Sequence, residues 1–170
     1  MTKPEFSREV ELKKIPQNGM RFDETAIQEE LTALAARYRL EAVLRFHVEA
    51  ELSSWRKKGI QAQGKVSATL RQTCVVTLEV FDQQLEENFN TLFLPARMIH
   101  DSDDPDADVP EAMTDGIADI GELAVQVLAL GIDPHPRKPD AEFQFQGKAA
   151  DAPVEEKDNP FQALKDLYDS

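Results

Sequence analysis

Apolar and polar residues alternate along two long stretches in the first half of the chain. In residues 40–52 every second position is apolar, and most positions between them are charged. Residues 59–71 repeat this pattern, with Gly64 interrupting the apolar series. A period of two predicts strands with one buried and one solvated face, as in an antiparallel sheet. A glycine in mid-strand indicates a bulge or the close approach of a neighbouring backbone.

Two further stretches also predict strands. Residues 6–15 predict a short edge strand, because Arg8 interrupts their apolar series. Residues 78–94 predict a strand with a bend near Asp82, since Leu85 and the two following phenylalanines share one face. The sheet is therefore expected to contain at least four strands.

Two segments have helical periodicity. Residues 24–38 predict a helix in which Thr25 and Gln28 form a capping box. A second helix begins at Asp119, a good N-cap residue, and ends at Gly131. Because this second segment is almost entirely apolar, we expect it to be the most buried helix.

The C-terminal region differs from the rest of the chain. Residues 141–158 contain few apolar residues and no clear period, which is typical of a flexible acidic linker. Asn159 and Pro160 then provide an N-cap and a first helical residue. So short a helix is marginally stable alone, so we expect residues 159–170 to dock on the body of the protein or on a partner.

These elements predict an α+β protein. Residues 1–140 form a single domain with a mainly antiparallel sheet, twisted or partly closed, on which two helices pack. The short C-terminal helix is tethered by the linker. The chain of 170 residues is long enough for one domain with a tail.

The composition indicates in which cellular compartment the protein is expected to work. A single cysteine excludes an internal disulfide framework and any zinc site built from several cysteines. The N-terminus has no apolar signal region, and no stretch approaches the roughly 20 apolar residues of a spanning helix. We therefore expect a cytoplasmic protein that does not enter a membrane.

Charge is divided unevenly along the chain. Residues 1–72 carry 13 Lys and Arg against 10 Asp and Glu, a net charge of +3, whereas residues 73–170 carry 6 against 22, a net charge of −16. The basic half leaves room for a local contact with RNA phosphates. The acidic half suits a basic protein partner. Solubility alone is the plainer explanation of an acidic composition.

A basic turn between the two alternating stretches is the candidate RNA contact. It consists of Trp55, Arg56, Lys57 and Lys58. The tryptophan could stack on a base while the three cations meet phosphates. The alternative is an ordinary hairpin loop whose tryptophan folds over the sheet edge, and the pattern alone leaves both open.

No catalytic, cofactor-binding or metal-binding constellation is evident. The three histidines are far apart in the sequence, and no second histidine lies at a metal-ligand spacing from any of them. A lone cysteine flanked by threonine and valine, as Cys74 is, is usually a small buried apolar residue. The seven glycines form no phosphate-binding loop. We therefore expect a protein that is not an enzyme and has no small-molecule substrate.

Three stretches together resemble the YceD family of bacterial large ribosomal RNA subunit accumulation proteins. They are LRQTCVVTLEVF, GIADIGELAVQVLALGIDPHP and the terminal NPFQALKDL. The positions that carry the resemblance, with no role assigned to them, are Gln72, Cys74, Asp119, Leu130, Pro134, Asn159, Pro160 and Phe161. Many members of the family have Cys-x-x-Cys in the first stretch, but here the second position is Thr77. A tetrahedral zinc site needs four ligands, so packing must hold this turn instead.

The resemblance implies a non-enzymatic role in the accumulation of large-subunit ribosomal RNA or in ribosome assembly. The expected partner is a ribosomal protein or ribosomal RNA. Two alternatives remain: an acidic, chaperone-like module that binds proteins and is unrelated to RNA, and an enzyme that processes RNA. The resemblance assigns no catalytic residue and no cofactor.

Overall fold

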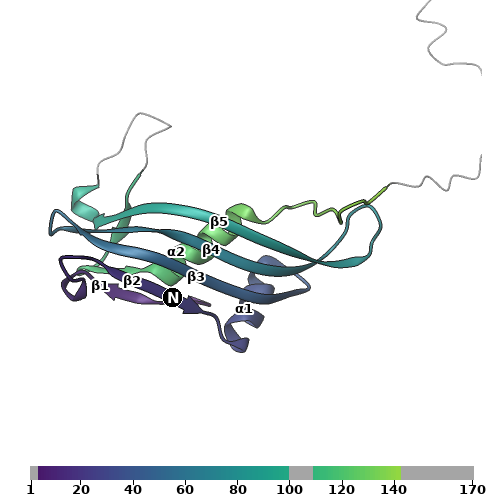
Figure 1. Cartoon of the computed structure of the whole chain (residues 1–170), viewed down its shortest axis with the longest axis horizontal. Helices are drawn as coiled ribbons and strands as arrows, with labels where there is room; N and C mark the ends of the chain where they lie inside the picture. Colours follow the sequence, from purple (N-terminus) through teal and green to yellow (C-terminus); the bar gives the residue numbers. More distant parts are fainter. Residues whose placement is uncertain (1–3, 100–108, 143–170) are drawn as a thin grey trace, which may run out of the picture.

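The computed structural model of the chain describes residues 4–99 and 109–142, and these form a five-stranded sheet with two helices (Figure 1). The strand order is β2-β3-β4-β5-β6, in which only the β5–β6 pair is parallel. The α+β class and the mainly antiparallel sheet are therefore confirmed. The strands are β2 (Met20–Thr25), β3 (Ala42–Trp55), β4 (Gly59–Thr73), β5 (Val80–Pro95) and β6 (Glu111–Met113).

Three long strands, β3, β4 and β5, form the centre of this sheet. Their pairing is antiparallel, and the β4–β5 register runs without a break from Ile60 opposite Phe93 to Thr73 opposite Val80. The expected bend near Asp82 is therefore absent, and β5 begins at Val80. Leu85, Phe89 and Phe93 point into the core, as their shared parity predicts.

Gly64 allows two strands to approach closely. It pairs with Ala50 on β3 and with Phe89 on β5, without a bulge. A Cβ atom added at Gly64 would lie 2.1 Å from the carbonyl oxygen of Glu49 and 2.7 Å from the Ala50 Cβ. Of the two interpretations of this glycine, the close backbone approach is the one that holds.

The start of β3 departs from simple alternation. The β3–β4 register shifts between Val43 and Arg45, so Val43 is buried and Leu44 is 40% exposed. The alternating pattern predicts the opposite for Leu44. The irregularity places Val43 instead of Leu44 on the buried face of the sheet. Buried and exposed positions then alternate again from Phe46, which is fully buried.

The first helix is shorter than predicted. The segment that contains Thr25 belongs to β2, where Thr25 lies opposite His47, and α1 spans Gln28–Tyr38. The predicted Thr25 cap is therefore wrong. Instead, the Glu30 side chain accepts a hydrogen bond from the Ile27 N–H at 2.9 Å. Polar residues just before a helix suit both an N-cap and an outward-facing strand, which explains the error.

The N-terminal segment does not join the main sheet. Strand β1 covers only Glu9–Glu11 and continues as a 3₁₀ turn, η1 (Leu12–Lys14). Its partner is β7 (Ile117–Asp119), with which it forms a separate two-stranded sheet. The predicted edge strand over residues 6–15 is thus too long and lies in the wrong sheet, because its partner is distant in sequence.

The second helix, α2 (Ile120–Gly131), fills the inner face of the sheet beside β4 and β5 (Figure 1). Seven of its residues are buried. The Tyr38 hydroxyl at the end of α1 donates to the Val125 carbonyl at 2.8 Å, which ties the two helices together. Asp119 is its N-cap, as predicted, because the carboxylate accepts from the Glu122 N–H at 3.0 Å. Among the described residues, no helix is long and apolar enough to cross a membrane.

The expected C-terminal helix and most of the expected linker lie outside the described residues. The division into a domain at 1–140, a linker at 141–158 and a terminal helix at 159–170 stays a prediction. A second 3₁₀ turn, η2 (Ala96–Met98), follows β5 and completes the described elements.

Candidate functional site

The basic turn forms the tip of the β3–β4 hairpin. Trp55 pairs with Gly59, and the Lys58 N–H donates to the Trp55 carbonyl at 2.9 Å. The two residues between them, Arg56 and Lys57, have φ angles of 47° and 57°. Positive φ at both central positions is usual for tight hairpins, but asparagine and glycine normally occupy them. Each non-glycine residue in the left-handed region costs about 1–2 kcal/mol, so two cations are held at a strained tip.

The tryptophan of the hairpin is partly covered. The Arg56 guanidinium lies over the Trp55 ring, with its Cζ 4.6 Å from the ring centroid. Trp55 is half-buried, whereas Arg56, Lys57 and Lys58 are exposed. The Lys57 and Lys58 cations are therefore accessible to a partner, and a base can stack on the ring face that Arg56 covers only when the guanidinium moves aside.

Further basic residues lie beside the hairpin tip. A hollow of about 690 Å³ is lined by Lys57, Lys58 and Arg97, together with Met98 of η2. A second hollow of about 690 Å³ is lined by Lys57 and residues of η1, including Lys13. We call this end of the molecule the basic end, made of Arg56, Lys57 and Lys58 of the hairpin tip together with Lys13 and Arg97.

Sequence reasoning found the hairpin but missed Lys13 and Arg97. They are separated by more than 80 positions and line two different hollows, both of which also include Lys57 of the hairpin tip. Two acidic residues, Glu11 and Asp115, also line these hollows. Glu11 is paired with Lys13 and Lys14 at 2.7 Å each, so part of the positive charge is already neutralised.

The turn at Cys74 is held by contacts with the segment after α2. The Val75 N–H donates to the Pro136 carbonyl at 2.9 Å, and the Lys138 N–H lies 3.4 Å from the Cys74 Sγ. The Thr77 N–H also approaches this sulfur, at 3.5 Å. An ion pair of 2.8 Å between Lys138 and Glu79 closes the contact. These contacts join the β4–β5 turn to the segment after α2, and they need no metal ligand at position 77.

The Cys74 thiol is completely buried and receives several hydrogen bonds. A bond from the Thr77 side chain and bonds from the backbone N–H groups of Lys138 and Thr77 lower the pKa of Cys74 to about 6, against the opposing effect of burial. The fold therefore stabilises the thiolate. Because the sulfur is inaccessible to solvent, it is not placed as a nucleophile.

The lowered pKa of Cys74 predicts a pH-dependent stability. The ordinary thiol pKa is near 9, so between about pH 6 and pH 9 the unfolded chain binds one more proton at this residue. Stability from the thiolate is complete above pH 9 and is lost as the pH falls through 6. Chemical denaturation across this range should show the difference in unfolding free energy between the native protein and Cys74→Ala growing with pH. A difference that is constant with pH would contradict the thiolate.

The remaining family-motif positions have separate locations. Gln72 is buried and lines a groove beside the Cys74 turn, together with the more exposed Pro134. Asp119 lies at the opposite end of α2, where it caps the helix. Leu130 is 87% exposed near the end of α2. Asn159, Pro160 and Phe161 lie outside the described residues.

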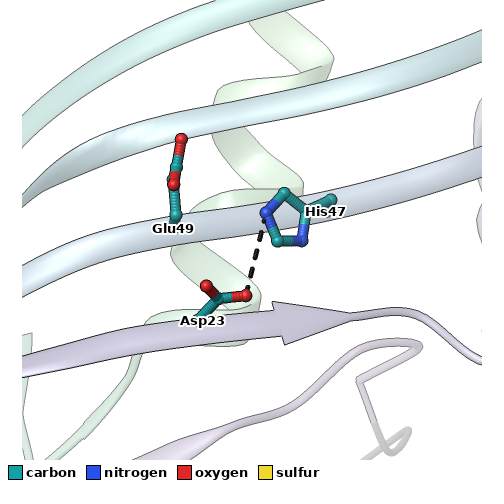
Figure 2. A group of neighbouring side chains, drawn as sticks. All are labelled: Asp23, His47 and Glu49. Carbon is teal, nitrogen blue, oxygen red and sulfur yellow. Dashed lines mark ion pairs between the residues drawn. The ribbon is translucent and has the colours of Figure 1, made fainter.

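A cluster of charged side chains that sequence reasoning missed lies on the solvated face of the sheet. Figure 2 shows Asp23, His47 and Glu49, whose ligand atoms lie within 4.8 Å of one another. The His47 Nε2 is 3.8 Å from the Asp23 carboxylate, and its Nδ1 is 3.0 Å from the Thr25 hydroxyl. The predicted helix over residues 24–38, with Asp23 placed next to its start, hid this proximity.

The chemistry of this cluster is that of paired charges. Arg21 binds the Asp23 carboxylate at 3.0 Å and lies 3.5 Å from Glu49. Lys65 also lies 3.5 Å from Glu49. A metal ion would have to displace these cations before the carboxylates could bind it. The arrangement therefore supports the cross-strand register rather than a metal site.

Comparison with known proteins identifies the family. The family model described as "Large ribosomal RNA subunit accumulation protein YceD" matches residues 62–168. No curated protein and no solved structure matches the chain. The matched range includes the Cys74 turn and α2 but begins after the hairpin tip. Because the match spans more than half of the 170 residues, the chain belongs to the YceD family of large ribosomal RNA subunit accumulation proteins.

Proposed function

We propose that this protein is a non-enzymatic factor that supports the accumulation of large-subunit ribosomal RNA by contacting that RNA through its basic end. Family membership supports the biological process. The observation that carries the contact is the hairpin tip, where Arg56 and Lys57 occupy left-handed positions that asparagine and glycine would fill at lower cost. Strained backbone of this kind is often kept for function.

The surroundings of the tip agree with an RNA contact. Arg97 and Lys13 lie next to the hairpin, with Lys13 already paired to Glu11, in an acidic protein with a net charge of −13. Concentrating cations at one end directs phosphates there while the rest of the surface repels them. A contact of this kind reads the RNA backbone rather than its sequence. In this proposal the protein works in the cytoplasm, where ribosomal subunits are assembled.

The hairpin can be tested by removing its charges. We expect the variant with Arg56, Lys57 and Lys58 all changed to alanine to bind transcribed large-subunit RNA roughly tenfold or more weakly near 0.1 M salt. A plot of log affinity against log salt concentration should also become less steep by about 2, since each lost phosphate contact on single-stranded RNA removes about 0.7. Fluorescence anisotropy with labelled RNA fragments measures both quantities.

A matched control removes the same charge elsewhere. Arg21, Lys65 and Arg71 are each paired with carboxylates on the solvated sheet face. Changing all three to alanine lowers the net charge by the same amount, and we expect RNA affinity to fall much less. Equal losses in the two variants would mean that only overall charge matters. Unchanged affinity in the hairpin variant would refute the proposed contact.

The competing hypothesis is a protein partner. The second half of the chain has a net charge of −16, which suits a basic ribosomal protein. Purification of the native protein with its companions, at low and high salt and with or without ribonuclease, separates the two hypotheses. A companion protein retained after ribonuclease treatment favours the chaperone-like function, whereas co-purifying RNA lost with the hairpin charges favours ours.

A further inference from the structure

A groove lies beside the Cys74 turn, at a different place from the basic end. Its volume is about 320 Å³. It is lined by the end of α1 and the connection that follows it, by the end of β4 and the Cys74 turn, and by the segment after α2. We call it the turn groove. Its apolar lining residues are Tyr38, Leu40, Val75, Ile132, Pro134 and Pro136.

Gln72 gives the turn groove an unsatisfied polar group. This residue lines the groove and is 5% exposed. Among residues 4–99 and 109–142, its Oε1 is the one buried side-chain polar atom that lacks a hydrogen-bond partner. An unpaired buried acceptor costs about 1–3 kcal/mol. Because this oxygen is not accessible to solvent, an occupant with an apolar group and a neighbouring N–H donor can satisfy it once the Gln72 side chain rotates toward the groove.

The chain itself supplies such an occupant close by. The described residues end at Glu142, shortly after Lys138, whose N–H approaches Cys74. Residues 143–158 separate this point from Asn159. A segment of that length spans at most about 55 Å when extended and about 22 Å on average when flexible. The terminal segment can therefore reach the groove, at a high effective concentration.

The terminal sequence has the required chemistry. Phe161 provides an apolar ring, and the Asn159 side chain provides an amide donor two residues before it. Leu164 and Leu167 continue the apolar stripe at helical spacing. The family match, residues 62–168, includes both this segment and the Gln72, Val75 and 132–136 parts of the groove.

We propose that the terminal segment docks in the turn groove of its own chain, with Phe161 against the apolar walls and the Asn159 amide donating a hydrogen bond to the Gln72 Oε1. With this docking, three motif stretches that are separate in the sequence lie side by side: the Cys74 turn, the segment after α2 and the terminal Asn-Pro-Phe. It does not depend on whether the protein binds RNA, because the basic end lies elsewhere on the molecule.

Photo-crosslinking of the full chain tests this docking directly. Phe161 is replaced by benzoylphenylalanine, and crosslinked peptides are identified by mass spectrometry. We expect crosslinks within one chain to peptides that contain residues 38–40, 72–75 or 132–136. Crosslinks to other surfaces, crosslinks only between two chains, or the absence of any crosslink would each overturn the proposal.

Point variants in the full chain provide a matched test. Val75 lines the groove and is 46% exposed, whereas Leu78 in the same turn is 77% exposed and does not line it. Val75→Glu should abolish the crosslink, and Leu78→Glu should leave it. Phe161→Ala should speed hydrogen exchange of the Val75 amide about tenfold, as expected for loss of a segment that is docked most of the time. Equal crosslinking in both turn variants, or unchanged exchange, would contradict the docking.

Discussion

Gly64→Ala is expected to lower the free energy of unfolding by about 3 kcal/mol. The added methyl group would lie 2.1 Å from the Glu49 carbonyl oxygen and 2.7 Å from the Ala50 Cα. Both are backbone atoms of the central strand β3, so there is no flexible side chain that could move to make room for the methyl group. The three central strands would have to separate locally and lose hydrogen bonds. Urea denaturation followed by circular dichroism measures this loss.

Gly116→Ala provides the comparison, because it makes the same chemical change in open space. Within the part of the chain that the structure describes, and apart from the two neighbouring residues, no atom lies within 4 Å of the added Cβ at Gly116, but φ there is +77°. The expected loss is about 1 kcal/mol, from the left-handed backbone alone. Equal losses at the two glycines would mean that the close approach of β3 and β4 relaxes at little cost.

Asp119→Ala is also expected to lower the free energy of unfolding by about 3 kcal/mol. The carboxylate accepts from the Ser7 hydroxyl at 2.6 Å, from the Arg8 N–H at 2.8 Å and from the Glu122 N–H at 3.0 Å. Loss of the cap costs about 1 kcal/mol, and the unpaired Arg8 N–H costs about 1–2 kcal/mol more. Hydrogen exchange should accelerate most at residues 7–11 and in the first turn of α2.

Asp119→Asn distinguishes the loss of acceptors from the loss of charge. Asparagine is an equally good N-cap residue and keeps one acceptor oxygen, so we expect a loss of about 1 kcal/mol. Should the asparagine variant be as unstable as the alanine variant, the negative charge rather than the hydrogen bonds would hold the N-terminal segment. The family-motif position Asp119 would in either case be structural.

Several parts of the fold follow from local sequence. The alternation around Gly64 predicts the long central strands, and the Asp119 cap predicts the start of α2. The hairpin at Trp55 follows from the position of a basic turn between two alternating stretches. In each case the deciding interaction lies within a few residues, so a period or a cap is sufficient evidence.

Other features depend on residues that are far apart. The bond from the Arg8 N–H to Asp119 joins residues separated by 111 positions, and no local pattern indicates it. Phe22 is buried in a strand only six residues long, and the acidic residues after it are equally suited to a helix start. The burial of Gln72 could have been predicted, because it continues the inward series of Ala68 and Leu70.

The pairing of β1 with β7 has a consequence for the order in which the protein folds. Strands β3, β4 and β5 are joined by short turns, so each pair can form as soon as its two strands exist. The β1–β7 pair must instead close a loop of more than 100 residues, which is slower because the entropy cost of closure precedes any gain from the contact. During synthesis the N-terminal segment with Phe6 therefore waits for the second half of the chain, and the protein completes its core only after α2 has been made.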